Sequence, residues 1–316
     1  MGTRKHSPQP YGYQELHVRS THSGWNMKLK NDHNDRNRPL ITVVMPVLNG
    51  EKYLADAIES VLHQEYRHFE FIIVNDGSTD RTDEIIKKYQ KIDKRIVYIK
   101  NNKKTGQSLA RNVAIKVAQG EYIALADSDD ICRSNRFNKQ IAYMVSHPKV
   151  DVLGTYFSIF FNDDPKKLQI VPAYSKNIVN GKAPVHNPTC VFKRSVFEKY
   201  GYYDKRFDNA EDVELWFRWF SKGVIFENIH EDLYKKRVHE GSVSISKIRH
   251  QVFLLFRINI NAIFNYGIKF SLHGYLYVME QLLYLIYLSL HLDRLFVRDK
   301  SVYNIKRKAE SEKTIN

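Results

Sequence analysis

Short apolar runs alternate with amphipathic segments over residues 41–126, and this alternation constrains the fold more than any other feature of the chain. Runs of strand length lie at 41–46, 69–74, 95–99 and 121–126. Segments with apolar residues at helical spacing lie between them, at 51–64, 80–92 and 107–118. Strands separated by single helices form a parallel sheet covered on both faces. The sequence therefore predicts a doubly wound α/β fold.

Three of the predicted strands end in loops rich in Asn, Asp and Gly. These loops are residues 46–50, 75–80 and 127–130. Each one by itself has the composition of an ordinary turn or helix cap. In open α/β sheets, however, ligands bind outside the carboxyl ends of the strands. Because all three loops fall on that edge, the sequence favours a nucleotide-type site over plain turn chemistry.

The third loop places three carboxylates, Asp127, Asp129 and Asp130, within four residues. Like charges this close repel one another and raise one another's pKa. A divalent cation would remove the conflict, and carboxylate oxygens suit Mg²⁺ or Mn²⁺. The alternative is an acidic loop that caps the helix beginning near Cys132. Asp130 in particular has no assigned role beyond such a cap.

The net charge of the chain, together with the motifs that it lacks, excludes several classes of function. The 316 residues carry a formal charge of +14, which indicates an anionic partner such as a nucleoside diphosphate, a membrane surface or nucleic acid. No basic stripe with interleaved aromatic residues occurs, so no nucleic acid is expected as a partner. The two cysteines have no metal-like spacing. Dinucleotide, P-loop, zinc-protease and nucleophile-elbow motifs are absent from the sequence.

Several short motifs follow one another in a fixed order along the chain. They are Pro46-x-x-Asn49, Asn75-Asp76-Gly77-Ser78-Thr79-Asp80, Ala110-Arg111-Asn112, Gly120-Glu121-Tyr122-Ile123, Asp127-x-Asp129-Asp130, His186-Asn187-Pro188-Thr189, Glu211-Asp212 with Trp216, and Arg237-Val238-His239. Together they resemble the family 2 glycosyltransferases of the GT-A fold, and most closely the bacterial enzymes that build surface polysaccharides. The resemblance covers residues 39–245, with a nucleotide-binding half at 39–130 and an acceptor or catalytic half at 131–245.

The resemblance implies an inverting, metal-dependent glycosyltransferase of the hexosyl or N-acetylhexosaminyl class. Its donor would be a nucleoside-diphosphate sugar, usually a UDP-sugar, and its acceptor a glycan or lipid-linked glycan of cell-surface polysaccharide synthesis. The implied donor-binding residues are Pro46, Val47, Leu48, Asn49, Asp76, Arg111, Asp127 and Ser128. Asp129 and His239 would hold Mn²⁺ or Mg²⁺, Asp212 beside Glu211 would be the catalytic base, and His186 and Trp216 would face the acceptor.

Other interpretations of these residues stay open. Glu211 and Asp212 also suit the first turn of a helix, where the dipole favours acids. Arg111 and Arg136 either assist the leaving diphosphate or form structural ion pairs. Trp216 lies three residues before Trp219, which favours a core position for both. A catalytically silent binding protein with the same fold is the alternative function.

Two departures from the family pattern concern the nucleotide base. Leu48 stands where relatives usually have a tyrosine, so stacking on the base is weakened or supplied elsewhere. Asn75 stands where the second loop often begins with a further aspartate. Both differences bear on the identity of the base, and neither touches the proposed metal or catalytic carboxylates.

The flanking segments lie outside the resemblance. Residues 1–38 are polar throughout and predict a disordered tail. Residues 246–316 predict a helical extension, whose apolar stretch Leu276–Leu290 is shorter than the ~20 residues that cross a bilayer. This extension either packs on the catalytic domain or a second copy, or lies on a membrane, with Lys306-Arg307-Lys308 meeting anionic lipids. The expected location is cytoplasmic, with peripheral contact to the inner membrane face as the second possibility.

Overall fold

The computed structural model describes residues 38–161, 168–239 and 248–289. All of these residues belong to one compact unit of the chain. The predicted polar tail, apart from Arg38, and the basic cluster Lys306-Arg307-Lys308 lie outside the described residues.

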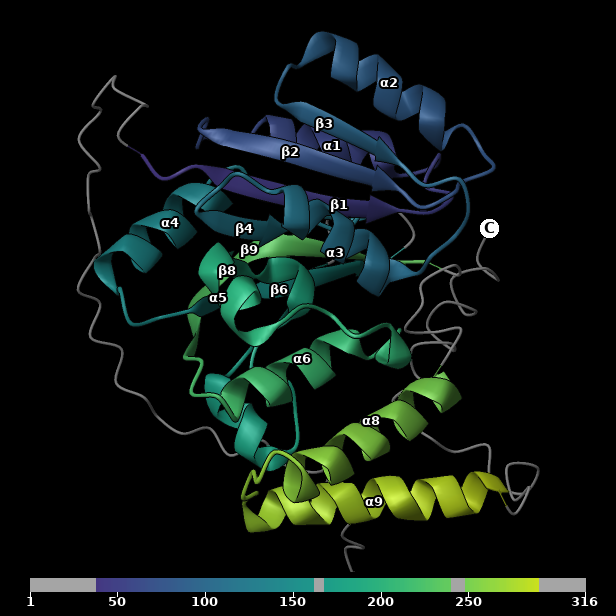
Figure 1. The fold of residues 1–316 in the computed structure, drawn as a ribbon, viewed down its shortest axis with the longest axis vertical. Coiled ribbons are helices and arrows are strands. Elements are labelled where there is room, and N and C mark those ends of the chain that lie inside the picture. Colours follow the sequence, from purple (N-terminus) through teal and green to yellow (C-terminus); the bar gives the residue numbers. More distant parts are fainter. Residues whose placement is uncertain (1–37, 162–167, 240–247, 290–316) are drawn as a thin grey trace, which may run out of the picture. The chain divides into compact units, whose positions relative to one another are not determined.

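The first half of the unit has the predicted alternation of strands and helices (Figure 1). Its elements are β1 (Ile41–Val47), α1 (Leu54–Leu62), β2 (Phe69–Asn75), α2 (Thr82–Ile92), β3 (Ile96–Lys100), α3 (Gln107–Val117) and β4 (Tyr122–Leu125). The strands are parallel and lie in the order β3-β2-β1-β4. This arrangement brings the carboxyl ends of β1, β2 and β4 to one edge of the sheet.

The second half extends the same sheet with mixed strand directions. Its elements are β5 (Ile131–Cys132), α4 (Arg136–Ser146), β6 (Val152–Phe161), β7 (Gln169–Val171), the 3₁₀ turns η2 (Ser175–Asn180) and η3 (Asn187–Thr189), β8 (Val191–Lys193), α5 (Arg194–Tyr200), η4 (Lys205–Phe207), α6 (Glu211–Phe220) and β9 (Phe226–Val238). The order continues β4-β8-β6-β9-β5, and β7 pairs with β6. Since β8 is antiparallel to both β4 and β6, only β6 and β9 run parallel here.

Two hydrophobic clusters hold helices against the two faces of the sheet. Alternate residues of β1 point to opposite faces, so Val43 and Met45 join the cluster under α1, α2 and α4. Val44 joins the other cluster, which includes residues of α3, α5 and α6. Burial on both faces explains why the β1 sequence is almost continuously apolar.

Two further helices, α8 (Ile248–Phe264) and α9 (Leu272–Ser289), form the predicted C-terminal helical extension. Leu254, Ile258 and Ala262 of α8 and Val278 of α9 belong to the same cluster as α6. Helix α8 therefore packs against α6, and α9 packs against α8 and η2 (Figure 1). Within the described residues, no helix combines the length and hydropathy that a membrane span requires.

Candidate functional site

Hydrogen bonds lock the loop after β1 to the loop after β2. Asn49 adopts a left-handed backbone conformation with φ of 53°, which asparagine tolerates better than most residues. Its N–H donates to Ser78 Oγ, and its Oδ1 accepts from the Thr79 N–H, both at 2.9 Å. At Gly50 a Cβ atom would lie 2.6 Å from Val47 Cγ2, so no larger residue fits without a shift. The predicted nucleotide edge is thus a fixed structure.

The donor-binding residues expected in the first loop differ in what they present to solvent. Leu48 is 37% exposed and Asn49 is also exposed, whereas Pro46 is half-buried. The Val47 side chain is 2% exposed and packs in the core, and its carbonyl oxygen accepts a bond from the Asp76 N–H at 2.8 Å. A contact of the Val47 side chain with a nucleoside is therefore not available in this structure.

Asp76 faces the segment before α3 instead of the open edge of the sheet. Its carboxylate accepts hydrogen bonds from Thr105 N–H (2.9 and 3.0 Å), Thr105 Oγ1 (2.6 Å), Gly106 N–H (2.9 Å) and Asn101 Nδ2 (2.8 Å). The residue is 4% exposed. These bonds engage both oxygens of the carboxylate, so in this structure Asp76 fixes the start of α3. Neither oxygen is left free for the predicted contact with a nucleotide base.

One guanidinium joins Asp127, which is predicted to face the donor, to the predicted catalytic helix. Arg111 of α3 places Nη1 2.5 Å from Glu211 Oε1 and Nη2 3.3 Å from Asp127 Oδ1. The side chains of Arg111 and Glu211 are 4% and 6% exposed, and that of Asp127 is 30% exposed. Of the two roles weighed for Arg111, the structure supports the ion pair. The pair also brings two separately predicted parts of the site together.

Glu211 and Asp212 form the first turn of α6. Glu211 is fully engaged, because its Oε2 accepts the Asn209 N–H at 2.7 Å while its Oε1 accepts from Arg111. Asp212 is half-buried, and its Oδ1 accepts the Val213 N–H at 2.9 Å. Burial raises the pKa of both carboxyl groups, whereas the nearby Arg111 cation opposes the rise. A carboxylate whose pKa is raised by burial is better suited to accept a proton as a general base.

Asp129 and His239 face each other at the end of β4 and just after β9. His239 Nε2 lies 3.0 Å from Asp129 Oδ2, and their side chains are 25% and 35% exposed. Burial raises the pKa of Asp129, and the charge on Asp127 raises it further. The contact with His239 opposes this rise. The divalent cation that the sequence predicts here would oppose it further.

The oxygen and imidazole ligands of Asp129 and His239 suit an Mn²⁺ or Mg²⁺ ion. Among the described residues, no three His, Cys, Asp or Glu side chains gather closely enough to form a metal site by themselves. Mg²⁺ sites commonly use one or two carboxylates and complete their shell with substrate phosphates and water. Asp129, with His239 beside it at 3.0 Å, would supply the protein ligands of such a site.

Asp130 and Arg237 support this loop from behind. Asp130 is 3% exposed, and its Oδ1 accepts the Arg237 N–H at 2.8 Å. Arg237 Nε also donates to the carbonyl oxygen of Asp129 at 3.0 Å. Burial and the two neighbouring aspartates raise the pKa of Asp130 well above its ordinary value. The contact that Asp130 makes is with β9, so the helix-cap interpretation does not describe it.

The residues expected to contact the acceptor are buried more deeply than such a contact would allow. The Trp216 side chain is completely buried, with Phe192 and Phe226 rings 5.7 Å away, so it reaches no acceptor in this conformation. The core interpretation of Trp216 therefore replaces the acceptor one.

His186 is half-buried, its ring packs 4.4 Å from Phe157, and burial lowers its pKa to about 4. Arg136 is buried and donates to the carbonyl oxygen of Leu125 at 2.9 Å, which makes it structural.

Sequence reasoning assigned no role to Arg237 and Asp208. Arg237 of β9 lies two residues before His239, which directly follows the strand, so a continued strand period would place both on one face, and this signal was available in the sequence. Asp208 caps α3 from a distant segment by accepting the Ser108 N–H at 3.1 Å. Nothing in the sequence near Asp208 indicates that partner.

Comparisons with known proteins identify the same family that the sequence motifs resemble. The model of glycosyl transferase family 2 matches residues 42–225. An uncharacterized glycosyltransferase of Methanocaldococcus jannaschii is 34% identical over 228 residues, which cover 69% of this chain and 77% of the relative. TuaG of Bacillus subtilis, named as a candidate teichuronic acid biosynthesis glycosyltransferase, is 31% identical over 222 residues, which cover 66% and 83%.

Solved structures share the fold at lower identity. S. aureus TarS 1-349 in complex with UDP-GlcNAc has a TM-score of 0.56 at 22% identity, and the match covers 70% of this chain and 66% of that one. PcManGT, a mannosyltransferase of Pyrobaculum calidifontis in complex with GDP-Man and Mn²⁺, has a TM-score of 0.62 at 15% identity, covering 88% and 81%. The predicted fold class and family resemblance are thereby confirmed: the chain belongs to glycosyl transferase family 2 and has the GT-A fold.

Proposed function

We propose that this glycosyltransferase moves a sugar, with inversion, from a nucleoside-diphosphate sugar to a glycan or lipid-linked acceptor of a cell-surface polysaccharide. The observation that carries the proposal is the buried link from Asp127 through Arg111 to Glu211, which ties a donor-side carboxylate to the helix that begins with Asp212. The kinship with TuaG supports the choice of acceptor class.

In the proposed reaction, Asp212 accepts the proton of the acceptor hydroxyl as the oxygen attacks the anomeric carbon. Attack from the side opposite the leaving nucleoside diphosphate inverts the configuration of the sugar. Glu211 is the weaker candidate for the base, because Arg111 and the Asn209 N–H engage its two oxygens. General-base assistance of this kind contributes a factor of about 10² to 10⁴.

The leaving diphosphate gains negative charge during transfer. Asp129 and His239 would hold Mn²⁺ or Mg²⁺, which supplies charge neutralisation at the diphosphate when bound. Asp127 would face the ribose or the sugar, and Arg111 behind it compensates its charge at 3.3 Å. Leu48 and Asn49 would border the base, with Ser128 on the sugar side.

We assign a UDP-sugar as the first candidate donor, and the test must include other bases. The related folds were solved with UDP-GlcNAc in one case and GDP-Man in the other. The experiment is release of nucleoside diphosphate from a panel of UDP- and GDP-sugars with Mn²⁺. Release from one donor, abolished by chelation of the metal, supports the proposal, and a failure to bind any donor with metal present refutes it.

We also propose that α9 meets an anionic membrane surface on the cytoplasmic side. Its exposed apolar residues, Leu272, Leu276, Met279 and Leu283, recur at intervals of three or four and therefore share one face. A lipid-linked acceptor would make such contact useful. Co-sedimentation with anionic vesicles tests it: Met279→Asp should abolish binding, whereas unchanged binding of that variant would eliminate this face as the contact.

A further inference from the structure

A cavity of about 400 Å³ lies between the η4 turn and the C-terminal half of α8. None of the residues predicted for the donor, metal or catalytic sites lines it. Its volume falls within the range of about 300 to 1,000 Å³ that is usual for small-molecule sites. The cavity is therefore large enough for a ligand of its own.

The lining combines cations with apolar side chains. The cations are Arg206 and Arg257, and the apolar residues that matter here are Phe207, Phe256, Ile260 and Phe264. Among the described residues, no carboxylate belongs to the lining. Phe264 is 77% exposed, so the apolar surface continues from the cavity toward solvent. This chemistry suits a ligand with an anionic group and an apolar part.

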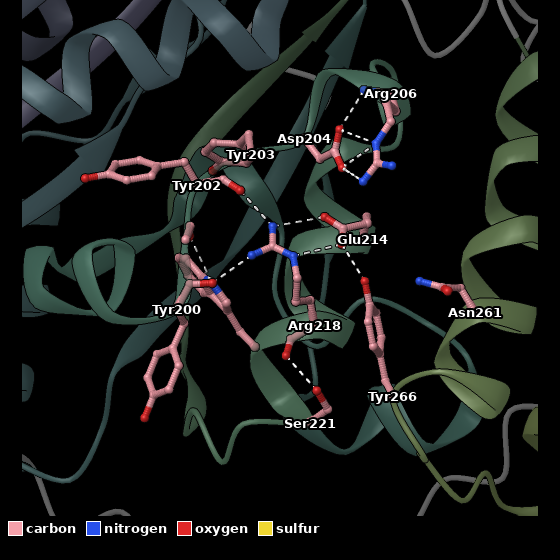
Figure 2. Close-up of polar contacts among 12 residues, drawn as sticks. Tyr200, Tyr202, Tyr203, Asp204, Arg206, Glu214, Arg218, Ser221, Asn261 and Tyr266 are labelled. Atoms are coloured by element: carbon pink, nitrogen blue, oxygen red, sulfur yellow. Dashed lines mark hydrogen bonds and ion pairs between the residues drawn. The ribbon is translucent and has the colours of Figure 1, made fainter.

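The two arginines differ in their capacity for a ligand. Arg206 Nη2 lies 2.5 Å from Asp204 Oδ2, and further bonds connect the same two groups, so its charge is compensated (Figure 2). Arg257 forms no ion pair with any residue that the structure describes. Its guanidinium lies 5.8 Å from the centre of the Phe207 ring and 5.7 Å from that of Phe253. Arg257 is thus the cation that an anionic ligand would find uncompensated.

The cavity is anchored to the catalytic helix. Tyr266, which is one of the lining residues, donates from its hydroxyl to Glu214 Oε1 at 2.8 Å. Arg218 donates to the same oxygen at 2.9 Å, and Figure 2 shows Arg218 and Tyr266 both bonded to Glu214 of α6. Phe207 precedes Asp212 by five residues, which an extended chain spans in at most about 18 Å. The part of the cavity that Phe207 lines therefore lies next to a backbone position within about 18 Å of Asp212, the proposed base.

We propose that this cavity binds an anionic amphiphile, a phosphate ester of an apolar chain. Its phosphate pairs with Arg257, and its chain packs on Phe207 and Phe264. Arginine suits this role because its guanidinium binds phosphate with two parallel hydrogen bonds. The proposal rests on the proposed function, since it identifies the ligand as the phosphate-linked carrier of the acceptor glycan.

The test uses octyl phosphate as the probe and calorimetric titration of the full chain. We expect octyl phosphate to bind at least about tenfold more tightly than inorganic phosphate or neutral octyl glucoside, because each of these has only one of the two groups. Arg257→Gln should weaken octyl phosphate binding at least about tenfold. Lys222→Gln, which removes an exposed cation outside the cavity, should change it less than about twofold. Phe264→Ser should weaken octyl phosphate and leave inorganic phosphate unaffected.

Equal binding of octyl phosphate by the wild type and Arg257→Gln would overturn the proposal. So would inorganic phosphate or octyl glucoside binding as tightly as octyl phosphate. Titration of the same proteins with sugar nucleotides and Mn²⁺ separates this inference from the proposed function. If the wild type bound no sugar nucleotide, the proposed function would be refuted. Octyl phosphate binding would still show whether the cavity takes an anionic amphiphile.

Discussion

Arg111 and Glu211 form a buried ion pair, with Nη1 and Oε1 2.5 Å apart and neither side chain more than 6% exposed. The two residues are 100 positions apart in the chain, Arg111 in α3 and Glu211 in α6. Because Glu211 directly precedes Asp212, this pair determines where the proposed base stands relative to the donor side. The geometry of the site thus depends on a contact that bridges its two halves.

Replacement of Arg111 by an uncharged residue should show how much the stability of the fold depends on this ion pair. Arg111→Gln leaves the Glu211 charge buried without its partner, so we expect the free energy of unfolding to fall by about 3 to 5 kcal/mol. The double variant Arg111→Gln with Glu211→Gln should recover most of the loss. Glu198→Gln, which breaks the exposed pair with Arg194, should cost about 0 to 1 kcal/mol. Urea titration measures all of them, and a fully stable Arg111→Gln protein would contradict the account.

Replacement of the proposed base should separate binding from transfer. Asp212→Asn keeps the shape of the side chain and removes its basicity, so donor affinity should stay within about twofold while the rate of transfer falls by about 10² to 10⁴. Single-turnover transfer and donor titration measure the two effects. Glu198→Gln serves again as the control. A variant with undiminished transfer would remove Asp212 from the role.

The pH dependence of transfer should report the same group. Asp212 must be deprotonated to accept a proton, and burial raises its pKa. The rate should therefore decline on the acid side at a pH above about 4, the ordinary value for aspartate. Because Glu211 titrates next to Asp212, the midpoint belongs to the pair. A rate constant that stays level down to about pH 4 would contradict the raised pKa.

Asp76 offers a choice between a base contact and a structural role. Asp76→Asn places an amide opposite the N–H groups of Thr105 and Gly106, so stability without any nucleotide should fall by about 1 to 3 kcal/mol. Thr105→Ala removes one hydroxyl donor and should cost less. If Asp76→Asn instead retained full stability and lost only nucleotide affinity, the role suggested by the family resemblance would be correct.

The order of elements could be predicted because local pattern determines it. The runs at 41–46 and 69–74 became β1 and β2, and the polar loops after them meet as parallel strands require. The pairing of β5 to β9 could not be predicted from local pattern. Strand β8 pairs antiparallel with β4 and strand β9 pairs parallel with β6, and both partners lie far away in the sequence.

The chemistry of single residues could be predicted in part. Asp129 and His239 came together as expected, at 3.0 Å. The direction of the Asp76 carboxylate depends on the loop around Thr105, and the partner of Arg111 depends on how α6 packs. Both are tertiary contacts without a local signal. Trp216 shows the reverse case, since its spacing from Trp219 already indicated the core.

Metal-dependent donor binding tests the central claim most directly. Calorimetric titration with the sugar nucleotide that the panel identifies, with and without Mn²⁺, should show binding that requires the metal. Asp129→Ala should lose this metal-dependent binding, and Asp212→Asn should retain it. Donor binding that is equally tight without Mn²⁺, or unchanged in Asp129→Ala, would contradict the account.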